Sequence, residues 1–551
     1  MVDNLFGTDG IRGLVNLEQV DDKTAISRLV EQREVHPAIM KLIGESLGRI
    51  INQHPQEKMI AVVGWDDRPA NMKLAESLTI GLNLAEFEVV QIGLCATPTL
   101  HLATLSHNAE FGCMITASHN PVEDSGLKIF NRYGYKTTPK FEQTLSHTLI
   151  TLAQEERELD QQDIEFLQQP AKRFELREWT IPEHRKWLEN RATTLASSVN
   201  YQKLISSTKL NTPLLIDSSK GTASIWFAEW LSAWGIEARE VSAEAVAMNL
   251  NCGAGDFSPT QTWTFDEAQN SPHLLIQKLP KCGPGLIVAA ALDGDGDRCL
   301  LIETTKTGYQ VIDGDRIADT LVNSVTKAGQ SWTLAASIES DLSLTTNLDR
   351  FQSIVHPLET AVGDRWLSFA LSSQESNHVY FDSVDMPTVI GVEDSGHIVL
   401  AAPHPNSSNQ WSLVGDGTMT LVAYLIAIHT CDETNLMKRG WKKRQSVKNV
   451  DRGKWDGKNQ LSDDIEHLLK QILTTHNSVV NWSRGTISGE PNLMAITCNY
   501  GGNMLSIGIR NSGTQAKISV SARLEYGGDS NGIQTAIDSV CQQLAKIMVI
   551  H

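Results

Sequence analysis

The sequence predicts an α/β protein built from several domains. Apolar strands alternate with helices from residue 59 onward, and loops containing glycine or proline separate them, which indicates crossover connections. A chain of 551 residues is too long for one hydrophobic core and suggests roughly three or four domains. The last part differs: a helix over 463–473, three strands and a terminal helix over 533–548 indicate an α+β unit.

Composition excludes several classes of protein. Hydrophobic residues make up 41% and charged residues 20%, as in ordinary soluble proteins. The net charge of 47 minus 65, or −18, argues against a general nucleic-acid surface and against binding to anionic membranes. Eight cysteines without a C-x-x-C pair indicate reduced thiols in a cytoplasmic protein. The polar N-terminus is not a signal peptide, and the apolar run 421–428 is too short to span a bilayer, so we expect a core helix there.

The first unit opens with a glycine-rich loop, 6–13, in which Arg12 faces an anion or lies on an ordinary surface turn. A strand over 59–64, a helix over 71–85 and a strand over 88–92 follow, and a further helix begins at Thr97.

The segment 112–121 starts as an apolar strand and breaks into Thr-Ala-Ser-His-Asn-Pro. Ser118 therefore stands on a loop at the carboxyl end of a strand, where α/β folds place ligands. It is either a nucleophile or phosphate carrier, with His119 beside it, or an N-capping serine in a turn. Lys128 is close enough in sequence to share this site, or it is a solvated lysine.

The second unit begins with a strand at 213–217 and ends with the apolar strand 286–292, which runs directly into Asp-Gly-Asp-Gly-Asp-Arg. Crowding Asp293, Asp295 and Asp297 behind a buried strand is costly unless a cation binds them. Oxygen ligands favour Mg²⁺ or Ca²⁺, but an EF-hand loop would need glycine and glutamate where Arg298 and Thr304 stand. Mg²⁺ is expected, with a phosphate oxygen completing its shell, and Arg298 is placed to bind that phosphate or the group that receives it.

The remaining segments carry weaker signals. Polar stretch 140–200 predicts surface helices, and basic stretch 432–459 predicts a linker. The loops 361–365 and 391–397 suit hydroxyl recognition or are plain loops. The segment 510–517 offers an arginine, two hydroxyls and a glycine, which form either a phosphate cradle or a hairpin turn.

Four loops in this order resemble those of the α-D-phosphohexomutase family: 116–121 its phosphoserine loop, 293–298 its metal loop, 393–397 its sugar loop and 510–514 its distal phosphate loop. The resemblance covers nearly the whole chain. It implies three related α/β domains with mixed sheets and a fourth, TATA-box-binding-protein-like α+β domain around a central cleft. The expected boundaries are 1–195, 196–306, 307–435 and 445–551.

The resemblance also implies roles. Ser118 is the phosphorylated serine, and its phosphate with the three aspartates holds one Mg²⁺ per chain. Lys128 acts in acid–base catalysis, and Arg12 and His119 line the same site. The residues expected to bind the substrate are Arg298, Val362, Gly363, Asp364, Glu393, Ser395, His397, Arg510, Ser512, Gly513 and Thr514.

The implied activity is the interconversion of hexose 6-phosphate and hexose 1-phosphate through a bisphosphorylated sugar, with a hexose 1,6-bisphosphate as activator. The loops 6–13 and 124–128 look most like those of phosphoglucosamine mutases. Val392 and Gln515-Ala516 depart from that pattern, so phosphomannomutase/phosphoglucomutase is the alternative, followed by a non-catalytic sugar-phosphate-binding homologue. A metal-dependent phosphatase has little need for two phosphate sites. We expect a monomer or homodimer that binds a small sugar phosphate.

Overall fold

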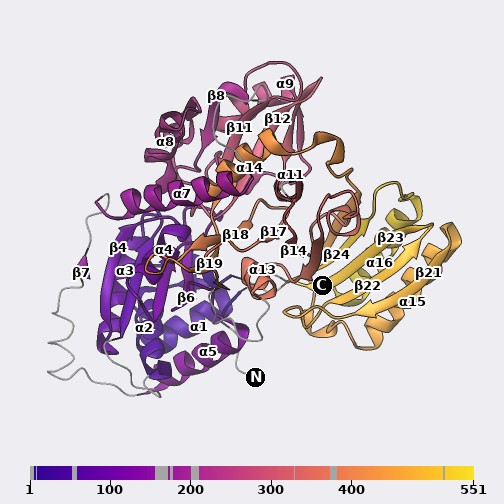
Figure 1. Cartoon of the computed structure of the whole chain (residues 1–551). Coiled ribbons are helices and arrows are strands. Elements are labelled where there is room, and N and C mark those ends of the chain that lie inside the picture. Colours follow the sequence, from indigo (N-terminus) through magenta and orange to yellow (C-terminus); the bar gives the residue numbers. More distant parts are fainter. Residues whose placement is uncertain are drawn as a thin grey trace.

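Four β-sheets follow one another along the chain in a computed structural model of the protein (Figure 1). The structure describes residues 5–7, 9–51, 59–155, 172–173, 178–199, 210–327, 329–372, 381–512 and 516–550. The sheets have seven, six, six and five strands. The fold is a mixed α/β architecture, as the sequence predicts, and the domain boundaries given above stay predictions.

The first sheet is mixed and carries the Ser118 loop. Its strand order is β2-β1-β6-β5-β3-β4-β7. The pairs β3–β4 and β3–β5 are parallel, whereas β5–β6 and β1–β6 are antiparallel. Its strands are β1 Ile11–Val15, β2 Glu34–Val35, β3 Ile60–Trp65, β4 Glu88–Leu94, β5 Phe111–Ile115, β6 Asp124–Asn131 and β7 Lys172–Arg173. Its helices are α1 Asp22–Gln32, α2 Pro37–Ile51, α3 Asn71–Leu84, α4 Thr97–Ser106 and α5 Pro139–Gln154.

The second sheet has the order β10-β13-β12-β11-β8-β9 and carries the aspartate loop between β11 and β12. Its strands are β8 Leu210–Asp217, β9 Ala238–Glu240, β10 Thr262–Thr264, β11 Ile287–Leu292, β12 Cys299–Thr304 and β13 Gly308–Ile312. Its helices are α8 Phe227–Ala233, α9 Phe265–Gln269 and α10 Leu274–Gln277.

The third sheet, β15-β14-β17-β18-β19-β16, shares a hydrophobic core with the second. Helix α14, Gly417–Thr430, supplies Leu421, Val422 and Leu425 to that core, which confirms the core helix predicted from the apolar run. The strands are β14 Trp332–Ser337, β15 Val355–Thr360, β16 Phe381–Asp382, β17 Val389–Val392, β18 Ile398–Pro403 and β19 Gln410–Gly415. The other helices are α11 Gly314–Lys327, α12 Ser343–Thr346 and α13 Asp364–Leu371.

The fourth sheet is antiparallel, in the order β20-β24-β23-β22-β21, and α15 and α16 cover one of its faces. The linker predicted over 432–459 is wrong, because β20 lies within it and pairs with β24 along its length. Trp441 and Val447 pack on the core, whereas Lys442, Arg444 and Lys448 lie on the other face, so the dense charge obscured the alternating pattern of a strand. The elements are β20 Trp441–Lys448, β21 Val479–Gly485, β22 Met494–Tyr500, β23 Asn503–Asn511, β24 Lys517–Leu524, α15 Gln460–His476 and α16 Asn531–Met548.

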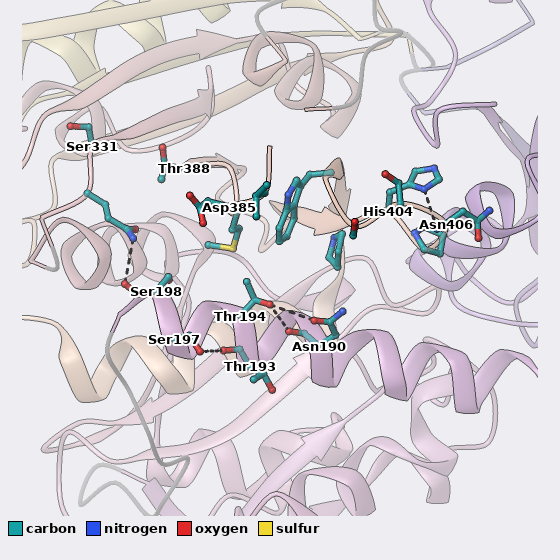
Figure 2. A pocket seen from close by; sticks show the side chains of 18 residues that line it. Asn190, Thr193, Thr194, Ser197, Ser198, Ser331, Asp385, Thr388, His404 and Asn406 are labelled. Atoms are coloured by element: carbon teal, nitrogen blue, oxygen red, sulfur yellow. Dashed lines mark hydrogen bonds between the residues drawn. The ribbon is translucent and has the colours of Figure 1, made fainter. Parts of the chain in front are cut away.

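Helix α7, Thr180–Ser198, lies within the stretch 140–200, for which surface helices are predicted, and it is exposed along one side. It buries Trp187, Leu188 and Leu195 and packs against α14 (Figure 1). Its hydroxyl-rich side, including Thr193 and Thr194, lines a cavity of about 1270 Å³ (Figure 2). In the described part of the chain, no helix is long and apolar enough to cross a membrane.

Candidate active site

Ser118 lies just past the end of β5, on a backbone that is held in an unusual conformation. Its φ of 54° falls in the left-handed region that non-glycine residues seldom adopt. The Ser118 N–H donates to Thr116 Oγ1 at 2.8 Å, and its carbonyl accepts from Arg68 at 2.7 Å and from Asn249 at 2.8 Å. The residue is 1% exposed. These bonds fix the direction in which the hydroxyl points.

Two of the groups that hold this loop were not among the predicted site residues. The buried Arg68 guanidinium also bonds the carbonyls of Asn120 at 2.9 Å and Asp124 at 2.8 Å, and it pairs with Asp66 at 3.1 Å. Asn249 reaches over from the segment between β9 and β10 and donates to Asn120 as well. The position of Arg68 after β3, at the same sheet edge as Ser118, is a signal that sequence reasoning could have used. The sequence around Asn249 contains no such signal.

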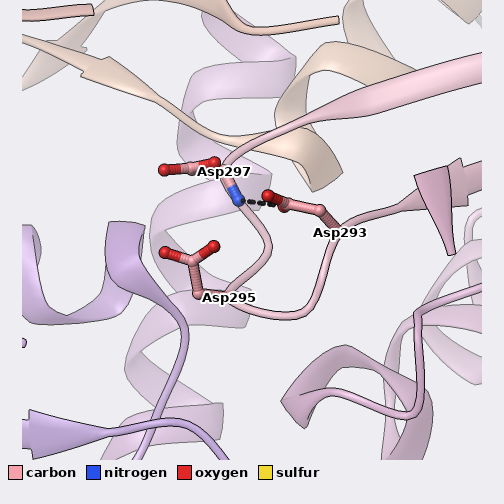
Figure 3. A group of neighbouring side chains, drawn as sticks. All are labelled: Asp293, Asp295 and Asp297. Carbon is pink, nitrogen blue, oxygen red and sulfur yellow. Dashed lines mark hydrogen bonds between the residues drawn. The ribbon is translucent and has the colours of Figure 1, made fainter. Parts of the chain in front are cut away.

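The three aspartates of the loop between β11 and β12 converge as predicted (Figure 3). One carboxylate oxygen from each lies within 4.8 Å of the others, and all three residues are 1–2% exposed. Asp293 Oδ2 accepts from Ser118 Oγ at 2.8 Å, so the serine and the aspartate loop form one site. One oxygen each of Asp295 and Asp297, Oδ1, is buried without a hydrogen-bond partner. Such a set of hard oxygen ligands fits Mg²⁺.

Lys128, on β6, lies among these carboxylates. Its Nζ is 2.7 Å from Asp295 Oδ2, 2.8 Å from Asp297 Oδ2 and 3.3 Å from Asp9. Burial lowers the pKa of Lys128, but Asp295 and Asp297 outweigh burial and raise it well above its ordinary value. Burial, then Asp297 and Asp295, raise the pKa of Asp293 to about 8. Lys128 and, at 3.9 Å from Asp293, Arg298 are cations that face this aspartate cluster.

A cleft of about 640 Å³ opens beside this centre and reaches the fourth sheet. Arg12, His119 and Arg298 line its end near Ser118, and Arg510 of β23 lines it on the fourth sheet. The expected sugar loops also line the cleft: Val362 and Gly363 precede α13, which begins at Asp364, and Glu393, Ser395 and His397 follow β17. None of the predicted site residues lines the α7 cavity described above.

The two sugar loops touch each other and the aspartate loop. Glu393 Oε1 accepts from the Gly363 N–H at 2.6 Å. His397 stands 3.4 Å from Asp364 and 3.8 Å from Asp297, which joins the cleft to the metal-binding end. Lys136 connects Asp364, at 2.7 Å, with Asp9, at 2.8 Å. Lys136 and Asp9 are further site residues that the sequence did not reveal.

His119 and Arg12 lie as expected at the mouth of the Ser118 site. Arg12 donates to the Ala117 carbonyl at 3.3 Å and pairs with Asp9 at 3.0 Å. Burial, then Arg298 and Arg12, lower the pKa of His119 to about 3. A neutral imidazole of such low basicity is a poor general base at neutral pH.

The distal phosphate loop is described only in part. Gly513 and Thr514 lie outside the described residues. Ser512 directly follows β23 and donates its N–H to the Lys517 carbonyl at 2.9 Å, and it is not among the described residues that line the cleft. Arg510 does line it and bonds Glu490 at 2.7 Å and Glu339 at 3.0 Å.

Comparison with known proteins agrees with this arrangement. A family model for phosphoglucomutase/phosphomannomutase, alpha/beta/alpha domain I, matches residues 3–156. The phosphoglucosamine mutase of Bifidobacterium longum is 25% identical over 99% of this chain and 98% of its own. That of Francisella tularensis subsp. novicida is 25% identical over 78% of this chain and 79% of its own.

Solved structures share the fold. A phosphoglucomutase/phosphomannomutase family protein from Burkholderia thailandensis superposes with a TM-score of 0.61 at 16% identity, covering 100% of both chains. The open form of the phosphoglucomutase parafusin from Paramecium gives a TM-score of 0.58 at 14% identity, covering 99% of this chain and 95% of its own.

Proposed function

Because the chain belongs to the α-D-phosphohexomutase family, we propose that it interconverts hexose 6-phosphates and hexose 1-phosphates through a phosphoserine at Ser118 and a bisphosphorylated sugar. One observation carries the proposal: Ser118 Oγ lies 2.8 Å from a buried aspartate cluster, beside a cleft whose other lining includes Arg510. An enzyme that moves a phosphoryl group between two positions of one sugar needs a phosphate carrier and a separate grip for the second phosphate.

Each half-reaction balances within the site. The bond between Ser118 Oγ and phosphorus breaks, a bond from phosphorus to the free sugar hydroxyl forms, and the hydroxyl proton ends on the serine oxygen. Lys128, the predicted acid–base residue, lies within contact distance of Asp295 and Asp297, and as an ammonium it would be the group that gives a proton to the leaving serine oxygen. After the bisphosphate turns round, the same steps run in reverse with its other phosphate.

The aspartates Asp293, Asp295 and Asp297 and the phosphoserine would hold one Mg²⁺. When bound, that ion supplies positive charge to the transferring phosphoryl oxygens. Arg298, on the same loop and lining the cleft, adds charge from the protein itself. Its guanidinium lies 3.9 Å from Asp293.

The other predicted residues position the sugar phosphate. Glu393, Ser395 and His397 face the cleft with the loop 362–364 and offer acceptors and donors to sugar hydroxyls. Arg510, with Ser512, Gly513 and Thr514, would bind the phosphate that is not being transferred. Holding both ends of the substrate supplies the in-line positioning on which phosphoryl transfer depends.

Glucosamine 6-phosphate is the proposed substrate, converted to glucosamine 1-phosphate. Support comes from the relatives named phosphoglucosamine mutases, which align along 99% of the chain. Mannose and glucose phosphates are the alternative. A coupled assay of the purified protein with the 1- and 6-phosphates of glucosamine, mannose and glucose, with catalytic hexose 1,6-bisphosphate as activator, decides between them. Turnover of none of the six compounds would refute the proposal and leave a non-catalytic homologue.

Three accompanying expectations stay predictions. The protein binds a small molecule and neither nucleic acid nor membrane. It acts in the cytoplasm. It is a monomer or homodimer.

A further inference from the structure

One face of the fourth sheet is strongly basic. Directly paired residues of antiparallel strands share a face, and the pairs Lys442–Arg523, Arg444–Ser521 and Ser519–Arg510 join three neighbouring strands. The opposite face, with Ile518 and Val520, packs under α15 and α16. We call the other side the basic face; it comprises Lys442, Arg444, Lys448, Arg510, Lys517 and the buried Arg523.

Two members of the basic face share one carboxylate oxygen. Glu339 Oε1, in the turn after β14, is 2.7 Å from Arg444 Nη1 and 3.0 Å from Arg510 Nη2. All three side chains line the cleft, and those of Arg444, Glu339 and Arg510 are 44%, 22% and 18% exposed. An anionic oxygen held between two guanidinium groups in an open cleft has the form of a phosphate subsite.

The other cations of the basic face are differently engaged. Lys442 pairs with Asp394 at 2.6 Å, and Arg523 pairs with Glu359 at 2.5 Å. Burial, then Arg444 and Arg510, lower the pKa of Lys517, which places its ammonium within the field of both arginines. Around Arg444 and Arg510, three cations with Lys517 therefore face two carboxylates, Glu339 and Glu490.

We propose that Arg444 binds the substrate's non-transferring phosphate together with Arg510, and that Glu339 occupies the two guanidinium groups until that phosphate displaces it. The inference rests on the proposed function and adds to it a residue that none of the four recognised loops contains. A phosphate monoester carries a charge of about −1.5 to −2 and three acceptor oxygens. It outcompetes a single carboxylate oxygen for two planar donor groups.

The test is calorimetric titration with inorganic phosphate, in EDTA, of the full-length protein and its variants. The loss of phosphate affinity in Arg510→Gln measures how much of the binding occurs at this end of the cleft. Arg444→Gln should weaken phosphate binding as much as Arg510→Gln does, by about tenfold or more. The phosphate affinity of Arg444→Lys should lie between those of wild type and Arg444→Gln, because lysine keeps the charge but lacks the paired N–H donors of a guanidinium group. The matched control is Lys443→Gln, which removes the same charge from the opposite face of β20 and should bind like wild type.

Glu339→Gln tests the second half of the proposal. Losing the competing carboxylate should tighten phosphate binding by up to about tenfold; weaker binding would overturn the exchange between Glu339 and phosphate. Phosphate affinity within about twofold of wild type in Arg444→Gln, while Arg510→Gln binds weakly, would overturn the role of Arg444.

The mutase assay separates this inference from the proposed function. A rise in KM of Arg444→Gln for glucosamine 6-phosphate that parallels its loss of phosphate affinity supports both. If Arg444→Gln loses phosphate affinity but the wild-type protein turns over no hexose phosphate, the phosphate subsite is supported and the proposed function is refuted. If Arg444→Gln is an active mutase with an unchanged KM and an unchanged phosphate affinity, the proposed function stands and the role of Arg444 is refuted.

Discussion

Lys128 occupies two of the carboxylates that would bind a metal ion, so we predict that Lys128→Met tightens Mg²⁺ binding. The Lys128 ammonium lies 2.7 Å from Asp295 and 2.8 Å from Asp297, and its side chain is 1% exposed. An entering ion would have to share these two carboxylates with the ammonium, whose positive charge weakens their attraction for the ion. A hydrogen bond between charged groups contributes ~1.5–3 kcal/mol. That range corresponds to a decrease in Kd of about ten- to a hundredfold.

Titration calorimetry with Mg²⁺ on the unphosphorylated protein measures this change. Lys73→Met is the control, because it removes an exposed lysine of α3 that pairs with Glu76 at 3.2 Å. We expect wild-type affinity from the control and tighter binding from Lys128→Met. An unchanged or weaker affinity for Mg²⁺ in Lys128→Met would refute the argument that lysine and metal compete for the same carboxylates.

Three further predictions follow from buried contacts. Asn249→Ala removes a donor to the Ser118 carbonyl at 2.8 Å and should lower kcat about tenfold or more while KM stays near wild type; an equal rise in KM instead would contradict it. Arg191→Met strands the buried Asp416, which Arg191 contacts at 2.6 Å, and should cost ~3–5 kcal/mol in unfolding, measured as a lowered midpoint in urea; the reasoning fails if the midpoint is unchanged. Burial lowers the pKa of His101 to about 4, so this side chain enters the fold uncharged and stability should decline as pH falls from about 6.5 towards 4; a thermal midpoint whose acid slope is the same in His101→Gln would speak against this assignment.

The sequence predicted the site where chemistry is concentrated in short loops. An apolar strand followed by alternating aspartates and glycines identifies a cation site without any knowledge of the fold, and the structure brings Asp293, Asp295 and Asp297 together. That Ser118 joins them depended on the family resemblance, because β5 and β11 belong to different sheets. No local pattern specifies which two strand ends meet across such a boundary.

The features that sequence analysis missed are of two kinds: side chains that bond the backbone of distant residues, and helices or strands whose buried face contains charged residues. Asn249, which lies between two strands of the second sheet, donates to the carbonyl of Ser118. Every residue has a backbone carbonyl, so the sequence does not show which one a side chain will contact. Strand β20 was hidden because its buried face is carried by few residues, chiefly Trp441 and Val447, among lysines and arginines. The sequence did not indicate that Arg191 of α7 is buried, because charged residues are usually exposed and this one pairs with Asp416 inside the fold.

The central claim is that Ser118 carries the phosphoryl group. Its most direct test is peptide mass spectrometry of the purified protein after incubation with a hexose 1,6-bisphosphate and Mg²⁺, alongside Ser118→Ala. We predict one phosphate on Ser118 in the wild type, and in Ser118→Ala neither that phosphate nor mutase turnover. Full mutase turnover by Ser118→Ala, or by a wild-type protein that never carries phosphate on Ser118, would contradict the account.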